Sequence, residues 1–126
     1  MLRLIVVDDD DDVRATVVGI LEDLDGVTIV AQGRSGEQAA RLVAKHRPDV
    51  VIIDLKMPVM GWAAIEPVRR ARPATRIIVL TAMPEADRHR ALRAGADAVV
   101  RKSGRVDLRT ELTEALGRVT RRADLT

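Results

Sequence analysis

Short apolar segments alternate along the chain with segments whose apolar residues recur at helical spacing. Three of the short segments are nearly continuous in valine, isoleucine and leucine, a composition typical of parallel strands buried on both faces. In the last helical segment, Leu108, Leu112 and Leu116 recur every four residues and form one face. The pattern predicts five strands, at Leu4–Val7, Val27–Ala31, Val50–Ile53, Ile77–Leu80 and Ala98–Val100.

Proline and glycine residues indicate where several helices begin and end. Pro84 stands at an expected first helical position, where its missing N–H removes no helical hydrogen bond. Gly26 and Gly95 stand where helix C-caps are expected. Pro67 falls inside the third helical segment, where it would remove one hydrogen bond and clash with the preceding turn. We therefore expect a kinked, shortened or shifted third helix.

The regular alternation of strands and helices predicts an α/β fold. Parallel strands joined through helices form right-handed crossovers, which cover both faces of a sheet. We predict a doubly wound, five-stranded parallel sheet, a (βα)5 three-layer sandwich of the flavodoxin-like type. The 126 residues contain no internal repeat and no low-complexity linker, which indicates one domain over residues 1–126.

Composition excludes several classes of function. No apolar run approaches the ~20 residues of a membrane span, and the N-terminus does not resemble a signal peptide. The 21 basic and 19 acidic residues are spread along the chain and Trp62 is the only aromatic residue, so we expect no direct nucleic-acid contact. Because cysteine is absent, disulfides and Cys-ligated zinc are excluded, and we expect a cytoplasmic protein without membrane contact.

Polar residues follow four of the five predicted strands. Asp8 and Asp9 follow the first strand, Asp54 the third, Thr81 the fourth, and Lys102 lies just beyond the fifth. Each alone has an ordinary explanation, such as a helix cap or a solvated surface residue. Together they would meet at the carboxyl-terminal edge of the sheet, where ligands bind in such folds. Three carboxylates at one edge require a compensating cation, and all-oxygen ligands select Mg²⁺ or a similar ion.

Five short motifs in this order resemble a known family. They are "VVDD" (Val6–Asp9), "DLKMP" (Asp54–Pro58), "LTA" (Leu80–Ala82), "GAD" (Gly95–Asp97) and Lys102. The chain resembles, over essentially its whole length, the CheY-like receiver domain of bacterial response regulators. The segment that leads into "DLKMP", and the "RKS" motif, are most similar to receivers that precede LuxR-type helix-turn-helix outputs.

The resemblance implies that Asp54 is the phosphoacceptor of a two-component signal transduction system. Asp54 would take a phosphoryl group from a histidine of a sensor histidine kinase. Mg²⁺ would be bound directly by Asp9 and Asp54, by the backbone carbonyl of Lys56, and by Asp8 through water. A carboxylate nucleophile suits in-line phosphoryl transfer, in which catalysis is mostly positioning and charge neutralisation.

The resemblance also implies a switch rather than an enzyme with its own substrate. Lys102 would pair with one phosphoryl oxygen, and Thr81 would move to hydrogen-bond another. The helices nearby would then repack and change the surface presented to an output domain or a downstream protein. The apolar stripes on the first and last helices leave open a homodimer, although core packing is their commoner use.

The chain departs from the family pattern in three further places. Val99 stands where most receivers have tyrosine or phenylalanine, which places the usual coupling to Thr81 in question. Gly61 and Trp62 replace an acidic or amide residue and a glycine, and that glycine position can require backbone freedom. Ser103 follows Lys102 where many receivers have proline, so a cis peptide bond is less expected there.

Two other functional hypotheses remain open at this point. A pseudo-receiver would keep the fold as an interaction module with little or no phosphorylation, and the unusual residues favour it. A haloacid-dehalogenase phosphatase would begin with the DxDxV pattern that Asp9, Asp11 and Val13 match. It also needs a later acidic pair to bind its metal, and the acids beyond Lys102 lie on or past a regular helix; they are Asp107, Glu111, Glu114 and Asp124. An EF-hand is excluded, because the sixth position of a loop starting at Asp8 is valine rather than glycine.

The run of five aspartates at residues 8–12 therefore has two predicted roles. Asp8 and Asp9 belong to the metal site. The following acids lie at the start of the first helix, where the helix dipole favours negative charge, and Asp11 or Asp12 is expected to cap it. Asp10 lies between the two groups and has no assigned role.

Overall fold

The computed structural model describes residues 1–56, 61–102 and 107–124, in which strands and helices alternate as expected. All five predicted strands form, each one or two residues longer than its predicted range. The elements are β1 (Leu2–Val7), α1 (Asp11–Glu22), β2 (Val27–Gly33), α2 (Gly36–His46), β3 (Val50–Asp54), the 3₁₀ helix η1 (Trp62–Ala64), α3 (Ile65–Ala71), β4 (Arg76–Thr81), α4 (Pro84–Ala94), β5 (Ala98–Arg101) and α5 (Leu108–Asp124).

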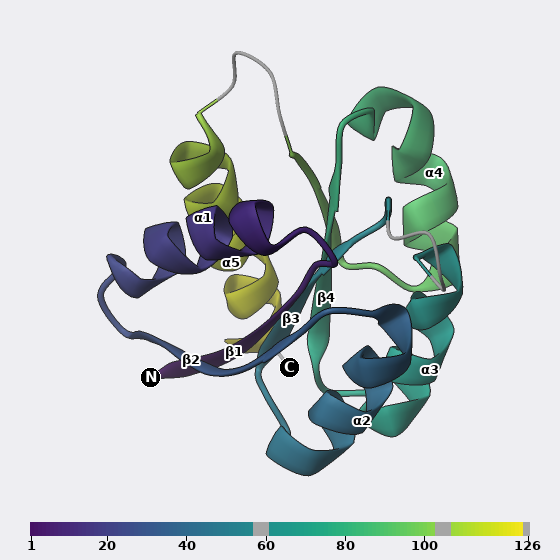
Figure 1. Ribbon diagram of the computed structural model, residues 1–126, viewed down its shortest axis with the longest axis horizontal. Coiled ribbons are helices and arrows are strands. Elements are labelled where there is room, and N and C mark those ends of the chain that lie inside the picture. Colours follow the sequence, from purple (N-terminus) through teal and green to yellow (C-terminus); the bar gives the residue numbers. More distant parts are fainter. Residues whose placement is uncertain (57–60, 103–106, 125–126) are drawn as a thin grey trace.

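The strands form one parallel sheet in the order β2-β1-β3-β4-β5, which confirms the doubly wound fold (Figure 1). The chain adds β2 on one side of β1 and the later strands on the other side, so the strand order switches between β1 and β3. Folds of this class bind ligands at such a switch point. Val7 pairs with Ile53, and Asp54 pairs with Leu80. The residues that follow β1, β3 and β4 therefore leave the sheet side by side.

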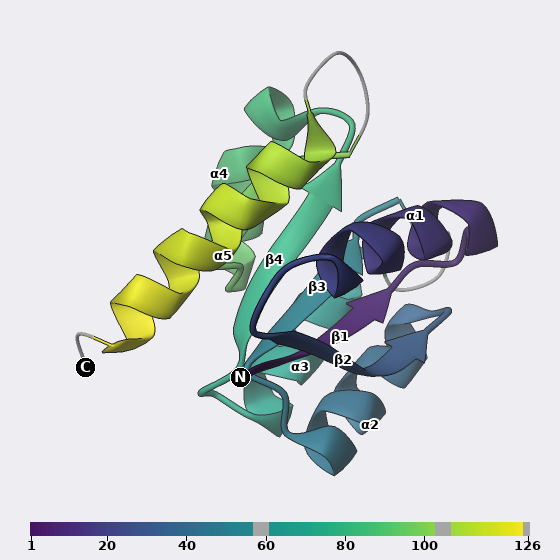
Figure 2. The same cartoon turned by 90° about the vertical axis from the view of Figure 1, so that its left-hand side faces the viewer.

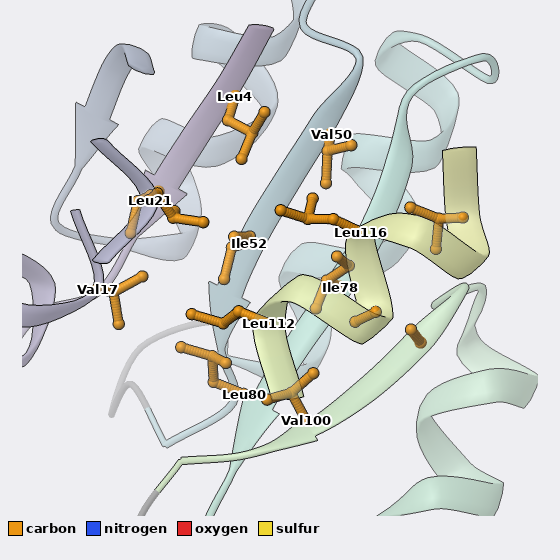
Figure 3. Packing of buried hydrophobic residues seen from close by; sticks show 14 of the residues in the cluster. Leu4, Val17, Leu21, Val50, Ile52, Ile78, Leu80, Val100, Leu112 and Leu116 are labelled. Carbon is orange, nitrogen blue, oxygen red and sulfur yellow. The ribbon is translucent and has the colours of Figure 1, made fainter. Parts of the chain in front are cut away.

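Helices cover both faces of the sheet, as the turned view shows (Figure 2). Because side chains alternate along a strand, each strand supplies both layers of the core. Leu4, Ile52 and Ile78 point to the face covered by α1 and α5, where they pack with Leu21 and Leu112 (Figure 3). The opposite face packs against α2, α3 and α4. No helix in the described part of the chain is long and apolar enough to span a membrane.

Two of the three predicted boundary residues lie where the sequence placed them. Pro84 is the first residue of α4, and Gly95 caps the C-terminus of that helix at φ +119°. The prediction for Gly26 is wrong. The helix α1 ends earlier, at its C-cap Asp23, and Gly26 lies at φ +79° in the turn before β2. Gly26 therefore supplies the left-handed conformation for the turn and not for the helix end.

The third helix is short, as Pro67 led us to expect. The α3 helix has seven residues and is preceded by the 3₁₀ helix η1, whose first residue is Trp62. Pro67 falls in the first turn of α3, where a missing N–H disturbs the helix least. Trp62 has a negative φ, so this position requires no glycine-like backbone freedom in this chain.

Candidate functional site

The predicted site residues converge at the carboxyl-terminal edge of the sheet. Asp8 follows β1, Asp54 ends β3 and Thr81 ends β4, and the three side chains are almost completely buried. Carboxylate oxygens of Asp8, Asp9 and Asp54 lie within 4.8 Å of one another. The fold therefore brings together three carboxylates that are up to 46 positions apart in the sequence.

Lys102 supplies the positive charge that faces these carboxylates. Its Nζ lies 2.6 Å from Asp54 Oδ2 and 3.8 Å from Asp8 Oδ2. The Lys102 backbone N–H donates to the Thr81 carbonyl at 2.8 Å, which fixes the start of the side chain at the edge of the sheet. The Lys102 ammonium thus faces two buried carboxylates, and the exposed Asp9 lies beside them.

Both oxygens of Asp54 have hydrogen-bond donors. Oδ2 accepts from Lys102, and Oδ1 accepts from the backbone N–H of Lys56 at 2.9 Å. Lys56 lies in the turn directly after β3, and its side chain is exposed. The turn therefore orients the Asp54 carboxylate through a backbone group, which does not depend on the identity of the side chain at position 56.

Asp8 has one oxygen without a hydrogen bond. Oδ1 accepts from the backbone N–H of Asp10 at 2.9 Å, whereas Oδ2 is buried and has no hydrogen-bond partner in the described residues. Burial is the largest cause that raises the pKa of Asp8, to about 6. The hydrogen bond from the Asp10 N–H lowers this pKa, the negative charge of Asp54 raises it, and the Lys102 ammonium lowers it. Hard divalent cations bind to groups of carboxylate oxygens, and the buried Asp8 oxygen lies beside two other carboxylates. These residues therefore fit Mg²⁺.

Thr81 has a partner that the sequence did not indicate. Its hydroxyl donates to Asp87 Oδ2 at 2.5 Å and accepts from the Met83 backbone N–H at 3.1 Å. Asp87 lies in the first turn of α4, six residues further along the chain. A carboxylate in the first turn of the helix after a strand-end threonine is a weak sequence signal, because such acids commonly serve the helix dipole alone.

A family model for the response regulator receiver domain matches residues 4–115. The chain belongs to the receiver domain family. The response regulator GacA of Pseudomonas aeruginosa is 32% identical over 121 residues, an alignment that covers 94% of this chain and 55% of GacA. The chain thus spans about half the length of this relative.

Solved receiver structures share both fold and sequence with this chain. The signal receiver domain of the response regulator NarL from Mycobacterium tuberculosis superposes with a TM-score of 0.83 at 32% identity, covering 94% of this chain and 96% of that one. The receiver domain of the sensor histidine kinase PA1611 from Pseudomonas aeruginosa has a TM-score of 0.77 at 27% identity, with coverage of 93% and 95%. That structure is described as having a magnesium ion coordinated in its active site cleft. These relatives confirm the predicted CheY-like fold and the likeness to regulators of the LuxR type.

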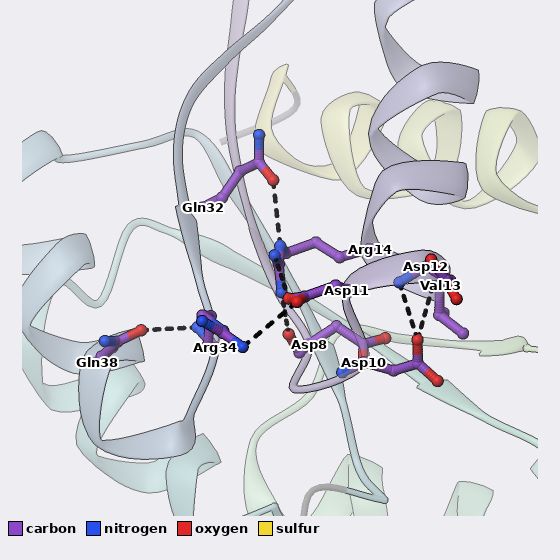
Figure 4. A network of polar contacts seen from close by, with 9 residues as sticks. All are labelled: Asp8, Asp10, Asp11, Asp12, Val13, Arg14, Gln32, Arg34 and Gln38. Atoms are coloured by element: carbon purple, nitrogen blue, oxygen red, sulfur yellow. Dashed lines mark hydrogen bonds and ion pairs between the residues drawn. The ribbon is translucent and has the colours of Figure 1, made fainter.

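In this receiver domain, the helix cap predicted for Asp11 or Asp12 is formed by Asp10. The Asp10 side chain accepts from the backbone N–H groups of Asp12 at 2.9 Å and Val13 at 3.1 Å (Figure 4). The cap must have extended backbone angles, and Asp10 has them, whereas Asp11 already lies inside the helix. Asp10, to which the sequence pattern assigned no role, is thus the N-cap of α1.

Asp11 belongs to an arginine network at the border of the site (Figure 4). Arg14 donates to Asp11 at 2.7 Å, to the Asp8 carbonyl at 2.7 Å and to Gln32 at 3.2 Å, and Arg34 lies 3.3 Å from Asp11. The hydrogen bond from Arg14, followed by the charge of Arg34, lowers the pKa of Asp11. Because Arg14 donates to the Asp8 carbonyl, the network also fixes the position of the loop between β1 and α1.

Two of the departures from the family pattern, Val99 and Trp62, lie at the core layer that α4 covers. Val99 is buried in the core layer that α4 covers, where it contributes an aliphatic side chain only. Trp62 packs against the same layer, and the Arg90 guanidinium of α4 lies 4.0 Å from its ring centroid. Ser103 and the motif residues Met57 and Pro58 lie outside the described residues, as does the expectation about the peptide bond after Lys102.

Proposed function

We propose that residues 1–126 form a single receiver domain in which Asp54 accepts a phosphoryl group from a phosphohistidine of a sensor histidine kinase. The observation that carries the proposal is the position of Asp54, which is buried, adjacent to two further carboxylates and bound by Lys102. In the transfer, an Asp54 oxygen forms the bond to phosphorus while the phosphorus–nitrogen bond of the phosphohistidine breaks. The electron pair of that bond returns to the kinase imidazole.

The residues suited to bind Mg²⁺ are Asp8, Asp9 and Asp54, with the Lys56 backbone carbonyl as a further ligand. A bound Mg²⁺ ion neutralises charge where the carboxylate and the phosphoryl group approach each other. The buried Oδ2 of Asp8 supports this assignment, because it accepts no hydrogen bond from the described residues and lies 3.8 Å from the Lys102 ammonium, which leaves it available to a cation. The magnesium reported for the PA1611 receiver domain supports it independently.

Lys102 and Thr81 complete the proposed phosphoryl site. The Lys102 ammonium already lies 2.6 Å from Asp54, within reach of an oxygen attached there, and can form a charge-assisted hydrogen bond to it. Thr81 ends the neighbouring strand and supplies a hydroxyl donor. No group in this arrangement implies a separate substrate, so we propose a signalling switch that takes part in its own phosphorylation and dephosphorylation, not an enzyme of another kind.

The switch is proposed to act on an output domain or a downstream protein in the cytoplasm. GacA is about twice as long as the present chain, which supports an output outside the receiver domain. The wide distribution of charge supports a receiver that makes no direct contact with nucleic acid or membrane. A homodimer would have to use surfaces other than the apolar stripes of α1 and α5, because those stripes pack into the core.

Incubation with acetyl phosphate and Mg²⁺, followed by intact-mass measurement, tests the proposal. We expect one phosphoryl group per chain in the wild type and none in Asp54→Asn, which keeps the shape of the side chain. Omission of Mg²⁺ should abolish the modification, and Glu66→Gln, a surface change on α3, should leave it intact. An unmodified wild type would support the pseudo-receiver instead, and modification of Asp54→Asn would place the acceptor at another residue.

A further inference from the structure

The Thr81 hydroxyl already donates one hydrogen bond and accepts another, and neither of them involves Asp54. Its single proton is donated to Asp87, at 2.5 Å between the oxygens, and its oxygen accepts the Met83 N–H. The side chain is 1% exposed, so water does not compete for the proton. A hydroxyl has one proton and can donate one hydrogen bond at a time.

Asp87 connects this hydroxyl to a helix with little apolar attachment. Of the residues of α4, only Pro84 and Ala91 are buried, whereas Leu92 is 45% exposed. Contacts of polar and charged side chains therefore help to position α4. Arg101 pairs with Glu85, Arg90 lies over Trp62, and Thr81 donates to Asp87.

We propose that Asp87 is a positioning residue that holds the Thr81 hydroxyl until Asp54 is phosphorylated; this inference rests on the function proposed above. For Thr81 to donate to a phosphoryl oxygen, its bond to Asp87 must break. The Asp87 carboxylate then loses its donor beside a newly added negative charge, and the first turn of α4 is released from β4. By linkage, whatever releases α4 also favours phosphorylation.

This arrangement connects the site to α4 without an aromatic residue. Val99 stands where the family pattern has tyrosine or phenylalanine, and it is buried with an aliphatic side chain. The bond from Thr81 to Asp87 joins β4 and α4 directly, through two side chains. The structure therefore offers a route for the switch that depends on charge and hydrogen bonding instead of aromatic packing.

One test needs no phosphorylation. Three-bond NMR couplings of Thr81 report its χ1 angle, and we expect a single rotamer in the wild type and rotamer averaging in Asp87→Ala. Glu85→Gln removes the neighbouring carboxylate on the same turn and should leave the Thr81 couplings unchanged. Averaged couplings in the wild type would overturn the inference, whatever the fate of the proposed function.

A second test measures the binding of beryllofluoride, a phosphoryl mimic, in the presence of Mg²⁺. Trp62 fluorescence is the readout, because the ring contacts Arg90 of α4. Loss of the competing charge-assisted hydrogen bond should raise the affinity of Asp87→Ala by about tenfold. In a Thr81→Ala background the same substitution should change the affinity by less than about twofold, because no hydroxyl remains to be released.

The outcomes separate this inference from the proposed function. A gain that persists in the Thr81→Ala background would mean that Asp87 acts by charge repulsion alone, and an equal gain in Glu85→Gln would mean general loosening of α4. Either result overturns the inference, as does an unchanged affinity in Asp87→Ala. A wild type without any response to beryllofluoride contradicts the proposed function, and the inference falls with it.

Discussion

The two ends of the sheet contain acidic residues in opposite electrostatic situations. At the amino-terminal end, Asp97 Oδ2 accepts from Arg69 at 2.7 Å and from the Ile77 N–H at 2.8 Å, and Arg76 lies 3.8 Å from Oδ1. Two guanidinium groups thus face one carboxylate. At the carboxyl-terminal end, the ion pairs of the site carboxylates among the described residues come from one ammonium group, that of Lys102.

The difference separates a carboxylate whose pairing stabilises the fold from the carboxylates that we propose to bind Mg²⁺. Arg69 also donates to the carbonyls of Pro73, Thr75 and Gly95, so this residue of α3 ties together the loop before β4 and the loop before β5. Asp8 instead keeps a buried oxygen that accepts no hydrogen bond from the described part of the chain. A deficit of positive charge is unfavourable for folding and favourable for binding a cation, which is a common compromise at functional sites.

Removing the acid at the well-compensated end should have the largest effect. Asp97→Ala leaves Arg69 without its carboxylate and the Ile77 N–H without an acceptor, so we expect a loss of about 3 kcal/mol in the free energy of unfolding. Urea denaturation measures it. Glu66→Gln, which removes an exposed ion pair with Arg70 on α3, should cost less than about 0.5 kcal/mol. Equal effects of the two substitutions would remove the contrast between the ends.

Neutralising an acid at the deficient end should stabilise the Mg²⁺-free domain. The folded-state pKa of Asp8, about 6, lies above its ordinary value of 3.8. The folded state therefore binds this proton more tightly, and stability falls as pH rises from about 4 to about 6. Asp8→Asn should add about 2 kcal/mol to the free energy of unfolding above pH 7, because it removes the repulsion from Asp54. This gain should vanish near pH 4, where Asp8 is protonated in the folded wild type. Urea denaturation at several pH values checks this, and a destabilised variant at pH 8 contradicts it.

Added Mg²⁺ should compensate the deficit in the wild type. At ten times the dissociation constant, binding to the folded state adds about 1.4 kcal/mol to the free energy of unfolding. Trp62 fluorescence supplies the dissociation constant, and thermal unfolding supplies the shift. Asp9→Ala should lose both responses, whereas Glu66→Gln should keep them. Stabilisation that survives in Asp9→Ala would place the ion elsewhere.

The smallest effect is expected from the exposed ion pair beside the site. Glu85 pairs with Arg101, but the Glu85 side chain is 74% exposed, so solvent screens the interaction. Glu85→Gln should change the free energy of unfolding by less than about 0.5 kcal/mol, as urea denaturation would show. A loss comparable to that of Asp97→Ala would mean that the carboxyl-terminal end also depends on ion pairs for stability.

Much of the fold and of the site could be predicted from local patterns. Apolar runs and their spacing predicted the strands, because burial on both faces demands continuous apolar residues. The topology rule for parallel sheets then placed Asp8, Asp54, Thr81 and Lys102 at one edge, since all their strands end there. Pro67 predicted the short α3, because proline restricts the backbone whatever its surroundings.

Long-range partners and backbone angles were decided only in the folded chain. Asp10 rather than Asp11 caps α1, because the cap depends on where the extended backbone turns into the helix. The pairing of Thr81 with Asp87 and of Asp97 with Arg69 depends on side-chain contacts that no spacing rule specifies. The sequence alone thus determined which chemical groups reach the edge of the sheet. The tertiary structure decided which of them are paired, and left one buried oxygen of Asp8 without a hydrogen bond from residues 1–56, 61–102 and 107–124, because burial and distance exist only once the chain has folded.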